Sequence, residues 1–178
     1  AVRGTGANNL NTVNYGLDGS PPNDGAGLTF NNGELFNQAA SWVSISNTAN
    51  GVAGDTIQGG DVLDFNLYTG NPQGFVGGVP TASTEAMYLK FDGIGAGEDF
   101  IMLLKLWDPG TGEYTTRAIM VQNADIQQGP GNGPGMFAGI TLDNNDGLIV
   151  IEANDYNLAG ENYVIVGAQI AGSDEGIA

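Results

Sequence analysis

The chain has 178 residues, of which 20 are Asp or Glu and four are Lys or Arg, and it contains no His and no Cys. Without imidazole or thiol groups, Ser-His and Cys-His nucleophilic sites and His-ligated zinc sites are excluded. The formal charge of −16 also opposes binding to nucleic acid and to anionic membranes, because both require Lys and Arg.

The chemistry that remains is that of oxygen ligands. A large negative charge destabilises the compact state by self-repulsion unless cations neutralise it, and carboxylate, amide and carbonyl oxygens suit hard divalent cations. We therefore expect bound calcium. Weak calcium sites fill outside the cell, so the same argument predicts a secreted or cell-surface protein.

The apolar fraction of 41% is enough for a core, and the length fits one domain. We expect this domain to cover residues 1–172 and residues 173–178 (SDEGIA) to begin a linker. No apolar run is long enough to cross a membrane, so we expect no membrane insertion. The absence of a signal peptide and of an initiator Met suggests a segment of a longer protein.

The secondary structure is expected to be strand. The 30 Gly and seven Pro residues interrupt the chain at short intervals, and no segment has the apolar spacing of an amphipathic helix. Leu63, Phe65 and Leu67 alternate onto one face, as do Met87, Leu89 and Phe91. The expected strands are Ala39–Ser46, Asp61–Tyr68, Ala86–Phe91, Phe100–Trp107, Tyr114–Val121, Met136–Leu142, Leu148–Ala153 and Tyr163–Ala168.

Short strands with turn-rich connections predict an all-β fold, an antiparallel β-sandwich of jelly-roll type stabilised by calcium. Phe100–Trp107 is apolar on nearly both faces, so we place it in the centre of a sheet. Five connections are longer or richer in oxygen ligands than a turn requires. A metal can order such Gly-, Asn- and Asp-rich segments, and the alternative is that each is a solvated loop. They are Leu17–Gly27, Asn47–Gly60, Thr69–Glu85, Asn123–Gly135 and Asn154–Asn162.

Two carboxylates in the first of these connections are candidate calcium ligands. Asp18 and Asp24 flank a Pro-Pro pair in DGSPPND. A diproline stiffens the backbone, so the two side chains can converge on a metal at small entropic cost. The alternative is an Asx-turn at each end of an exposed loop.

The densest set of oxygen ligands is LDNNDGLIVIEANDYN, residues 142–157. Asp143, Asn145 and Gly147 match the opening of an EF-hand loop, but its last position requires Glu and is occupied by Asn154, so an EF-hand is excluded. Asp143, Asn145 and Asp146 are candidate calcium ligands. The alternative is that Asn-Asp-Gly only closes a hairpin.

A second group of candidate ligands follows the next expected strand. Asn154, Asp155 and Asn157 lie at the opposite end of that strand from Asp143, so we expect two separate sites rather than one.

IGAGEDFIM, residues 94–102, is similar to the calcium-binding nonapeptide of β-rolls, with Ile94 in place of the first Gly. It occurs once, and a solenoid requires stacked copies. Asp99, with Asp92 and Glu98, remains a candidate ligand for a single ion. In contrast, Asp61 and Asp64 point to opposite faces of a strand and are not expected to share a site.

An enzyme would have to use carboxylate pairs, as in glycoside hydrolysis. Glu98 with Asp99, or Glu152 with Asp155, are the available pairs. Adjacent residues on a strand diverge, and the two Trp residues give little surface for stacking against sugars. We therefore expect a protein that is not an enzyme.

Two segments carry a resemblance to a known family. STEAMYLKFDGIGAGEDFIMLLKLWDPGTGEYTTRAIMVQNADI and GITLDNNDGLIVIEANDYNLAGENY resemble the peptide-binding domains of large bacterial repeats-in-toxin adhesins, and the likeness covers about residues 60–172. It implies a calcium-stabilised domain, secreted between flanking adhesin domains, that mediates cell adhesion and biofilm formation. Its expected partner is the C-terminal peptide of a host or neighbour-cell surface protein, held with the help of calcium.

The resemblance also suggests how the peptide is held. A calcium ion with few protein ligands keeps open positions that an α-carboxylate can fill, and the cation reverses the local charge. In GPGNGPG, Gly131, Asn132 and Gly133 would let backbone amides approach the peptide. Asn154 and Asp155 are further candidate contacts, and Tyr156 or Phe137 would form an apolar wall, unless these rings pack in the core.

Two other functions remain open from the sequence. One is a calcium-dependent carbohydrate-binding module, which would need an exposed aromatic ring beside the calcium. The other is a structural extender domain, in which calcium only rigidifies the chain.

Overall fold

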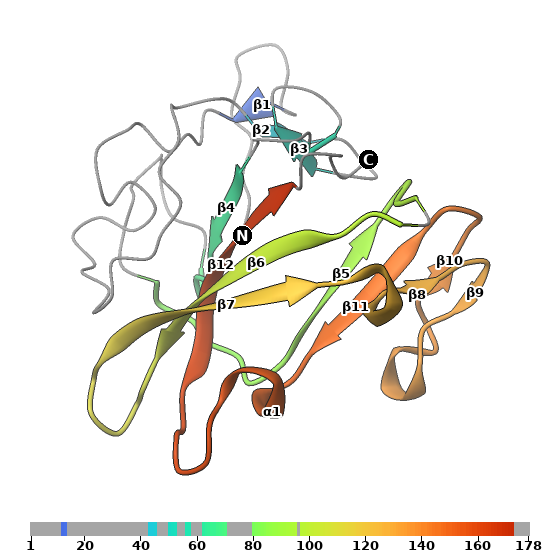
Figure 1. Cartoon of the computed structure of the whole chain (residues 1–178). Helices are drawn as coiled ribbons and strands as arrows, with labels where there is room; N and C mark the ends of the chain where they lie inside the picture. The colour runs from blue at the N-terminus through green and yellow to red at the C-terminus, as the bar shows by residue number, and fades with distance from the viewer. Residues whose placement is uncertain are drawn as a thin grey trace.

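The computed structural model describes residues 12–13, 43–45, 50–52, 56–57, 62–70, 80–95 and 97–172 (Figure 1). Strands dominate these residues, and every strand pair is antiparallel. Within these described ranges, helix is confined to one short α-helix and two 3₁₀ turns, which confirms the expected all-β class. These are α1 (Ala153–Tyr156), η1 (Asn123–Asp125) and η2 (Gly135–Phe137). No helix in the described ranges has the length and hydropathy of a membrane span.

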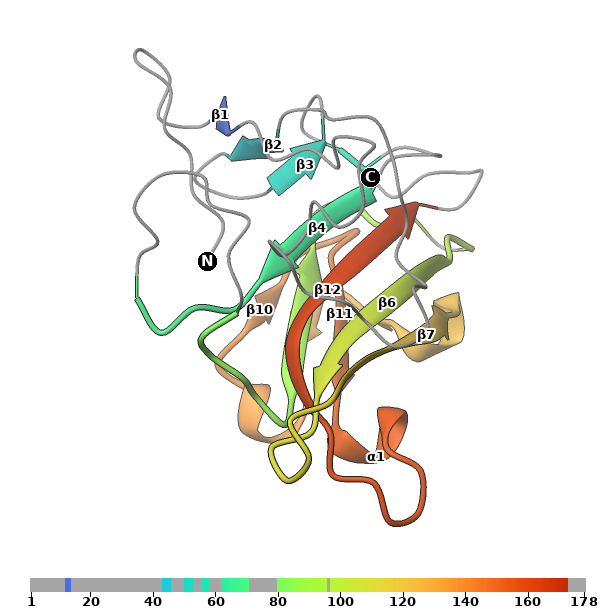
Figure 2. The ribbon, with the colours of Figure 1, turned by 90° about the vertical axis from the view of Figure 1, so that its left-hand side faces the viewer.

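The largest sheet has four strands in the order β4-β12-β6-β7 (Figure 2). Its central strand β6 pairs with β7 from Phe100↔Val121 to Trp107↔Tyr114. On its other side β6 pairs with β12, with an irregularity between Ile165 and Gly167. The bounds are β4 (Val62–Asn66), β6 (Phe100–Trp107), β7 (Tyr114–Val121) and β12 (Val164–Gly172).

The other strands form smaller sheets. A three-stranded sheet has the order β5-β11-β8, and β9 pairs with β10 beside it, while β1, β2 and β3 form a separate three-stranded sheet. The bounds are β1 (Thr12–Val13), β2 (Val43–Ile45), β3 (Asn50–Val52), β5 (Met87–Phe91), β8 (Gln127–Gln128), β9 (Gly131–Asn132), β10 (Thr141–Leu142) and β11 (Gly147–Ile151).

One hydrophobic cluster is shared by the four-stranded sheet and the β5-β11-β8 sheet. Alternate residues of β6 enter it, since side chains one position apart on a strand point to opposite faces. The rings of Phe91 on β5 and Phe100 on β6 lie 5.0 Å apart, which joins the two sheets directly. The β6 members, all 0% exposed, are Phe100, Met102, Leu104 and Leu106.

The opposite face of β6 is also buried. Leu103 is 3% exposed and Lys105 is 0% exposed. The expected central position of Phe100–Trp107 is therefore confirmed, with bounds that match the prediction. The single charge in this strand lies on the face that does not enter the hydrophobic cluster.

Several expected strands were wrong in part. The strand expected over Asp61–Tyr68 ends at Asn66, and the one expected over Tyr163–Ala168 continues to Gly172. Within Met136–Leu142 only Thr141 and Leu142 are strand, because η2 occupies the beginning of the segment. Within Leu148–Ala153 the strand ends at Ile151, and Ala153 begins α1. The α1 turn is favoured there because the Asp155 Oδ2 atom accepts the backbone N–H of Glu152 at 2.7 Å, which closes the first turn of the helix.

Candidate functional site

The β10–β11 turn contains Asp143 and Asp146, and Asp146 closes it. Its side chain is 3% exposed and pairs with Lys90 Nζ at 2.8 Å. The Asp146 Oδ2 atom that pairs with Lys90 also accepts the backbone N–H of Asp143 at 2.6 Å. Asn145 adopts a φ of 73°, a left-handed conformation that Asn tolerates in turns. The Asn-Asp-Gly sequence therefore forms a turn, and the Asp146 carboxylate is committed to it. The turn does not close the expected hairpin, because β10 pairs with β9 whereas β11 pairs with β5 and β8.

The ion pair shifts the pKa values of both Asp146 and Lys90. Burial acts to raise the pKa of Asp146, but the hydrogen bonds from Lys90 and from the Asp143 backbone outweigh it and hold this pKa below its ordinary value. The hydrogen bond to Asp146 raises the pKa of Lys90, and the charges of Asp143 and Asp92 add to the effect. Lys90 therefore lies in a local field of several carboxylates.

Asp143, Asn144 and Asn145 have exposed side chains on the same turn. Their oxygens face solvent, whereas the Asp146 carboxylate is occupied by Lys90. Among the described residues, no three acidic side chains converge as metal ligands would. A cation at this turn would therefore have to combine Asp143 with amide or carbonyl oxygens.

The segment around Gly131–Gly133 lies directly beside this turn. Asn132 pairs with Thr141, and Gly131 pairs with Leu142, the residue before Asp143. In addition, the N–H of Gly129 donates to the Asp146 carbonyl at 2.8 Å. The structure thus brings together two groups of candidate residues, the Gly-rich segment and the Asp143 turn, that the sequence placed in separate connections.

Close packing explains why Gly129 and Gly133 are glycine. A Cβ atom on Gly129 would lie 2.0 Å from the Asp143 carbonyl oxygen, and one on Gly133 would lie 2.4 Å from the Phe137 carbonyl oxygen. The Gly133 N–H is already used, because it donates to the Ile140 carbonyl at 2.9 Å. Part of the glycine pattern therefore serves the packing of this segment rather than the approach of a ligand.

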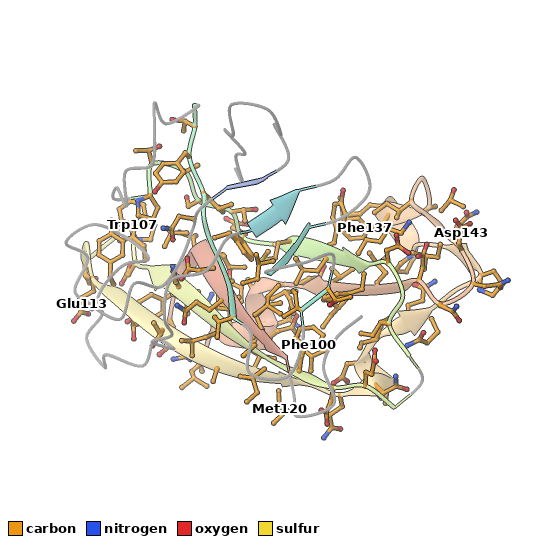
Figure 3. The ribbon with its side chains drawn as sticks, turned by 90° about the horizontal axis from the view of Figure 1, so that it is seen from above. Phe100, Trp107, Glu113, Met120, Phe137 and Asp143 are labelled. Atoms are coloured by element: carbon orange, nitrogen blue, oxygen red, sulfur yellow. The ribbon has the colours of Figure 1, made fainter. Side chains whose placement is uncertain are left out.

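An aromatic pair lies at the same end of the molecule. Figure 3 shows Phe137 and Asp143 together, far from Trp107 and Glu113. The Phe137 ring is 5.2 Å from that of Tyr88, which is 49% exposed, and Met136 beside it is 88% exposed. Sequence reasoning missed Tyr88, although the alternation that points Leu89 inward also points Tyr88 outward.

Tyr156 belongs to the core instead. It is 1% exposed and is part of the hydrophobic cluster, and its hydroxyl donates to the Glu85 carbonyl at 2.9 Å. Burial raises the pKa of Tyr156. Of the two alternatives for this ring, the structure shows core packing, so the ring does not line a surface.

Asn154, Asp155 and Asn157 lie at the opposite end of β11 from Asp143, as expected (Figure 1). Asp155 closes the first turn of α1, as described above. Asn157 bridges the following loop, since its Nδ2 donates to the Tyr163 carbonyl at 3.0 Å and its Oδ1 accepts the Tyr163 N–H at 2.9 Å. Asn154 is exposed. Asp155 and Asn157 therefore use side-chain oxygens to order their own segment.

Arg117 on β7 connects that strand to the segment that follows α1. Its guanidinium pairs with Glu161 at 2.7 Å and donates to the Tyr156 carbonyl. The hydrogen bond from Arg117 lowers the pKa of Glu161. These contacts hold the 157–163 loop against the four-stranded sheet.

The remaining candidate ligands are Asp99, Asp18 and Asp24. Asp99 is exposed, while the neighbouring Glu98 accepts the Gly95 N–H at 2.5 Å and so closes its own loop. Asp18 and Asp24 lie outside the described residues.

A polar cluster that sequence reasoning did not identify lies on the four-stranded sheet. Lys105 Nζ is 2.7 Å from Asp64 Oδ1 and 3.0 Å from Asn66 Oδ1. Gln169 Nε2 donates to Asp64 Oδ2 at 2.7 Å. The available signal was Lys105 itself, a single charge within the apolar run FIMLLKLW.

Comparisons of the chain with protein-family models, with curated proteins and with solved structures find no match.

Proposed function

We propose that this chain is a calcium-dependent adhesin module that binds the free C-terminal residues of a partner protein. The supporting observation is the adjacency of three features: the exposed oxygens of the Asp143–Asn145 turn, the Gly131–Gly133 segment and the Tyr88–Phe137 pair. A cation, backbone groups and an apolar surface within one region are what recognition of a short peptide terminus requires.

In this proposal calcium binds Asp143, with help from amide and carbonyl oxygens of the turn. Few protein ligands leave open coordination positions, and the peptide α-carboxylate fills them. Calcium is needed because a chain of charge −16 otherwise repels an anionic terminus. Asp146 contributes indirectly, since its contacts with Lys90 and with the Asp143 N–H fix the turn.

The proposal includes the architecture and the setting. The four-stranded sheet and the β5-β11-β8 sheet form a jelly-roll-like sandwich around their shared core, and calcium stabilises it by neutralising charge. The module is secreted to the bacterial cell surface as part of a repeats-in-toxin adhesin, with other adhesin domains in the same chain. It has no enzymatic activity, and its partner is a surface protein of a host or neighbouring cell, bound during adhesion and biofilm formation.

Calorimetry with a C-terminal free-acid peptide and its amide tests this function. The amide loses the charge and the bidentate contact with calcium. We expect binding about ten- to a hundredfold weaker, since a charge-assisted contact is worth about 1.5 to 3 kcal/mol. EGTA should abolish binding of the free acid. Equal binding of the two peptides, with or without calcium, would contradict the proposal.

The exposed Tyr88 ring favours one alternative, a calcium-dependent carbohydrate-binding module. An aromatic face beside a calcium ion can stack on a sugar whose hydroxyls bind the metal. Monosaccharides titrated in the same calorimeter separate the two functions. Binding of sugars without binding of free-acid peptides would replace the peptide proposal.

A further inference from the structure

On β4, β6 and β12 of the four-stranded sheet, the polar residues lie on the face that the hydrophobic cluster does not use. On β4, Leu63 and Phe65 contact the cluster, and Asp64 and Asn66 alternate with them. Lys105 alternates with Leu104 and Leu106 on β6 in the same way. Lys105 is nevertheless buried, with a side chain that is 0% exposed, and Asp64 and Asn66 are half-buried, the Asp64 side chain being 14% exposed.

The register of the sheet brings these side chains together. Gly167 on β12 is the partner of Asn66 on one side and of Lys105 on the other. A Cβ atom on Gly167 would lie 2.7 Å from Asn66 Oδ1. The Asn66 amide therefore lies over the glycine, in the space that a side chain of the intervening strand would otherwise fill.

The resulting cluster places an amine between a carboxylate and a carboxamide. Lys105 Nζ lies 2.7 and 2.9 Å from the two Asp64 oxygens and 3.0 Å from Asn66 Oδ1. Gln169, which is 0% exposed, donates to Asp64 Oδ2 and so fixes the orientation of the carboxylate. Asn66 Cγ, the carbon that Nζ would attack, is bonded to the Oδ1 atom that Nζ already contacts, and groups held close together gain the rate advantage of an intramolecular reaction.

We propose that Lys105 and Asn66 react to form an intramolecular isopeptide bond, with Asp64 as the proton carrier. Asp64 first takes a proton from the Lys105 ammonium group. The neutral Nζ then attacks Asn66 Cγ, and a new C–N bond forms. The C–Nδ2 bond breaks as Asp64 passes that proton to Nδ2. Asp64 then takes a second proton from Nζ and hands it to the departing ammonia, so one ammonium ion leaves and Asp64 is ionised again. The step is a transamidation, so no oxidant or reductant is needed.

Burial favours this reaction. Water, which would hydrolyse an activated amide, is excluded from a fully buried amine. The product links β4 to β6, so one covalent bond spans the intervening strand β12.

The intact mass of the purified chain tests the proposal without any variant. We expect a mass lower than the sequence mass by one ammonia, and a proteolytic fragment in which the peptide of Lys105 is joined to that of Asn66. An intact mass equal to the sequence mass would overturn the proposal. Loss of one water with a Lys105–Asp64 link would also overturn it, because Asp64 would then be the electrophile.

Two controls assign the chemistry. Asn-Gly sequences such as Asn132-Gly133 can also lose ammonia by forming a succinimide, but they yield no linked peptide. Lys105→Arg retains the charge and cannot form the bond, so the linked peptide should be absent. Asp64→Asn keeps both reacting residues and should remain unlinked. A linked Asp64→Asn variant would overturn the role of Asp64 as proton carrier.

Discussion

The Asp143–Asp146 turn makes a quantitative prediction for Asp146→Ala. The substitution removes the acceptor of the Asp143 N–H and the partner of Lys90. A hydrogen bond from a buried group to a carboxylate contributes about 1.5 to 3 kcal/mol. The ion pair adds less, about 0.2 to 1 kcal/mol, because the Lys90 side chain is 39% exposed and therefore screened by water.

We therefore expect Asp146→Ala to reduce the free energy of unfolding by about 2 to 4 kcal/mol. For a domain of this size the melting temperature should fall by roughly 4 to 16 °C. Thermal unfolding followed by circular dichroism, in EGTA so that calcium does not contribute, measures the change. Asp143→Ala is the matched control, since its side chain is exposed, and it should change the free energy by less than about 0.5 kcal/mol. An unchanged melting temperature for Asp146→Ala would refute the structural role of this carboxylate.

Three further predictions concern calcium, the two ends of β11 and pH. Calcium at a hundredfold excess over the dissociation constant should add about 2.7 kcal/mol per site, so a melting temperature unchanged by EGTA would contradict calcium stabilisation. Asp155→Ala should reduce the free energy of unfolding by about 1 kcal/mol, because the contact that closes α1 is lost, and should leave peptide binding intact. Asp143→Ala should mainly weaken peptide binding in calorimetry. Equal losses of stability and binding in both variants would argue against separate roles. The pKa of Asp146 is lowered from 3.8 and that of Lys90 is raised from 10.5, so the pair stabilises the fold between these values. The difference in melting temperature between wild type and Asp146→Ala should therefore shrink as the pH falls through the lowered Asp146 pKa. It should also shrink as the pH rises through the raised Lys90 pKa. A melting-temperature difference that stays constant with pH would exclude the ion pair as the cause of that difference.

Local patterns predicted two of the long strands well. β6 matches its expected bounds as a run that is almost entirely buried, and β7 matches them as a strand whose exposure alternates from Ala118 to Val121. β8 and β9 were not predicted, since short Gly- and Gln-containing segments have little strand propensity of their own and pair only because a neighbouring strand supplies the register. α1 was missed for a related reason. Its four residues show no helical periodicity, and it depends on the contact between Asp155 and the Glu152 N–H.

The candidate site was predictable only in its local parts. The turn at Asp143–Asp146 follows from Asn-Asp-Gly, and the outward position of Tyr88 follows from alternation on β5. The pairing of Lys90 with Asp146 does not, because it depends on the register between β5 and β11. The same is true of the contact between β9 and β10, which joins the Gly-rich segment to the turn.

The two proposals rest on different sheets and can fail independently. The calcium and peptide site would lie at the β10–β11 turn, whereas the proposed cross-link joins Asn66 on β4 to Lys105 on β6. A lone Lys within an apolar strand indicates that a buried partner exists, because an unpaired buried ammonium is too costly. Which residues become the partners of Lys105 depends on β12, because Gly167 on that strand leaves room for the Asn66 amide beside the Lys105 amine. A cross-linked chain that does not bind calcium would support the Lys105–Asn66 bond and contradict the calcium and peptide site. A chain of full sequence mass that binds peptide in the presence of calcium would support the calcium and peptide site and contradict the bond.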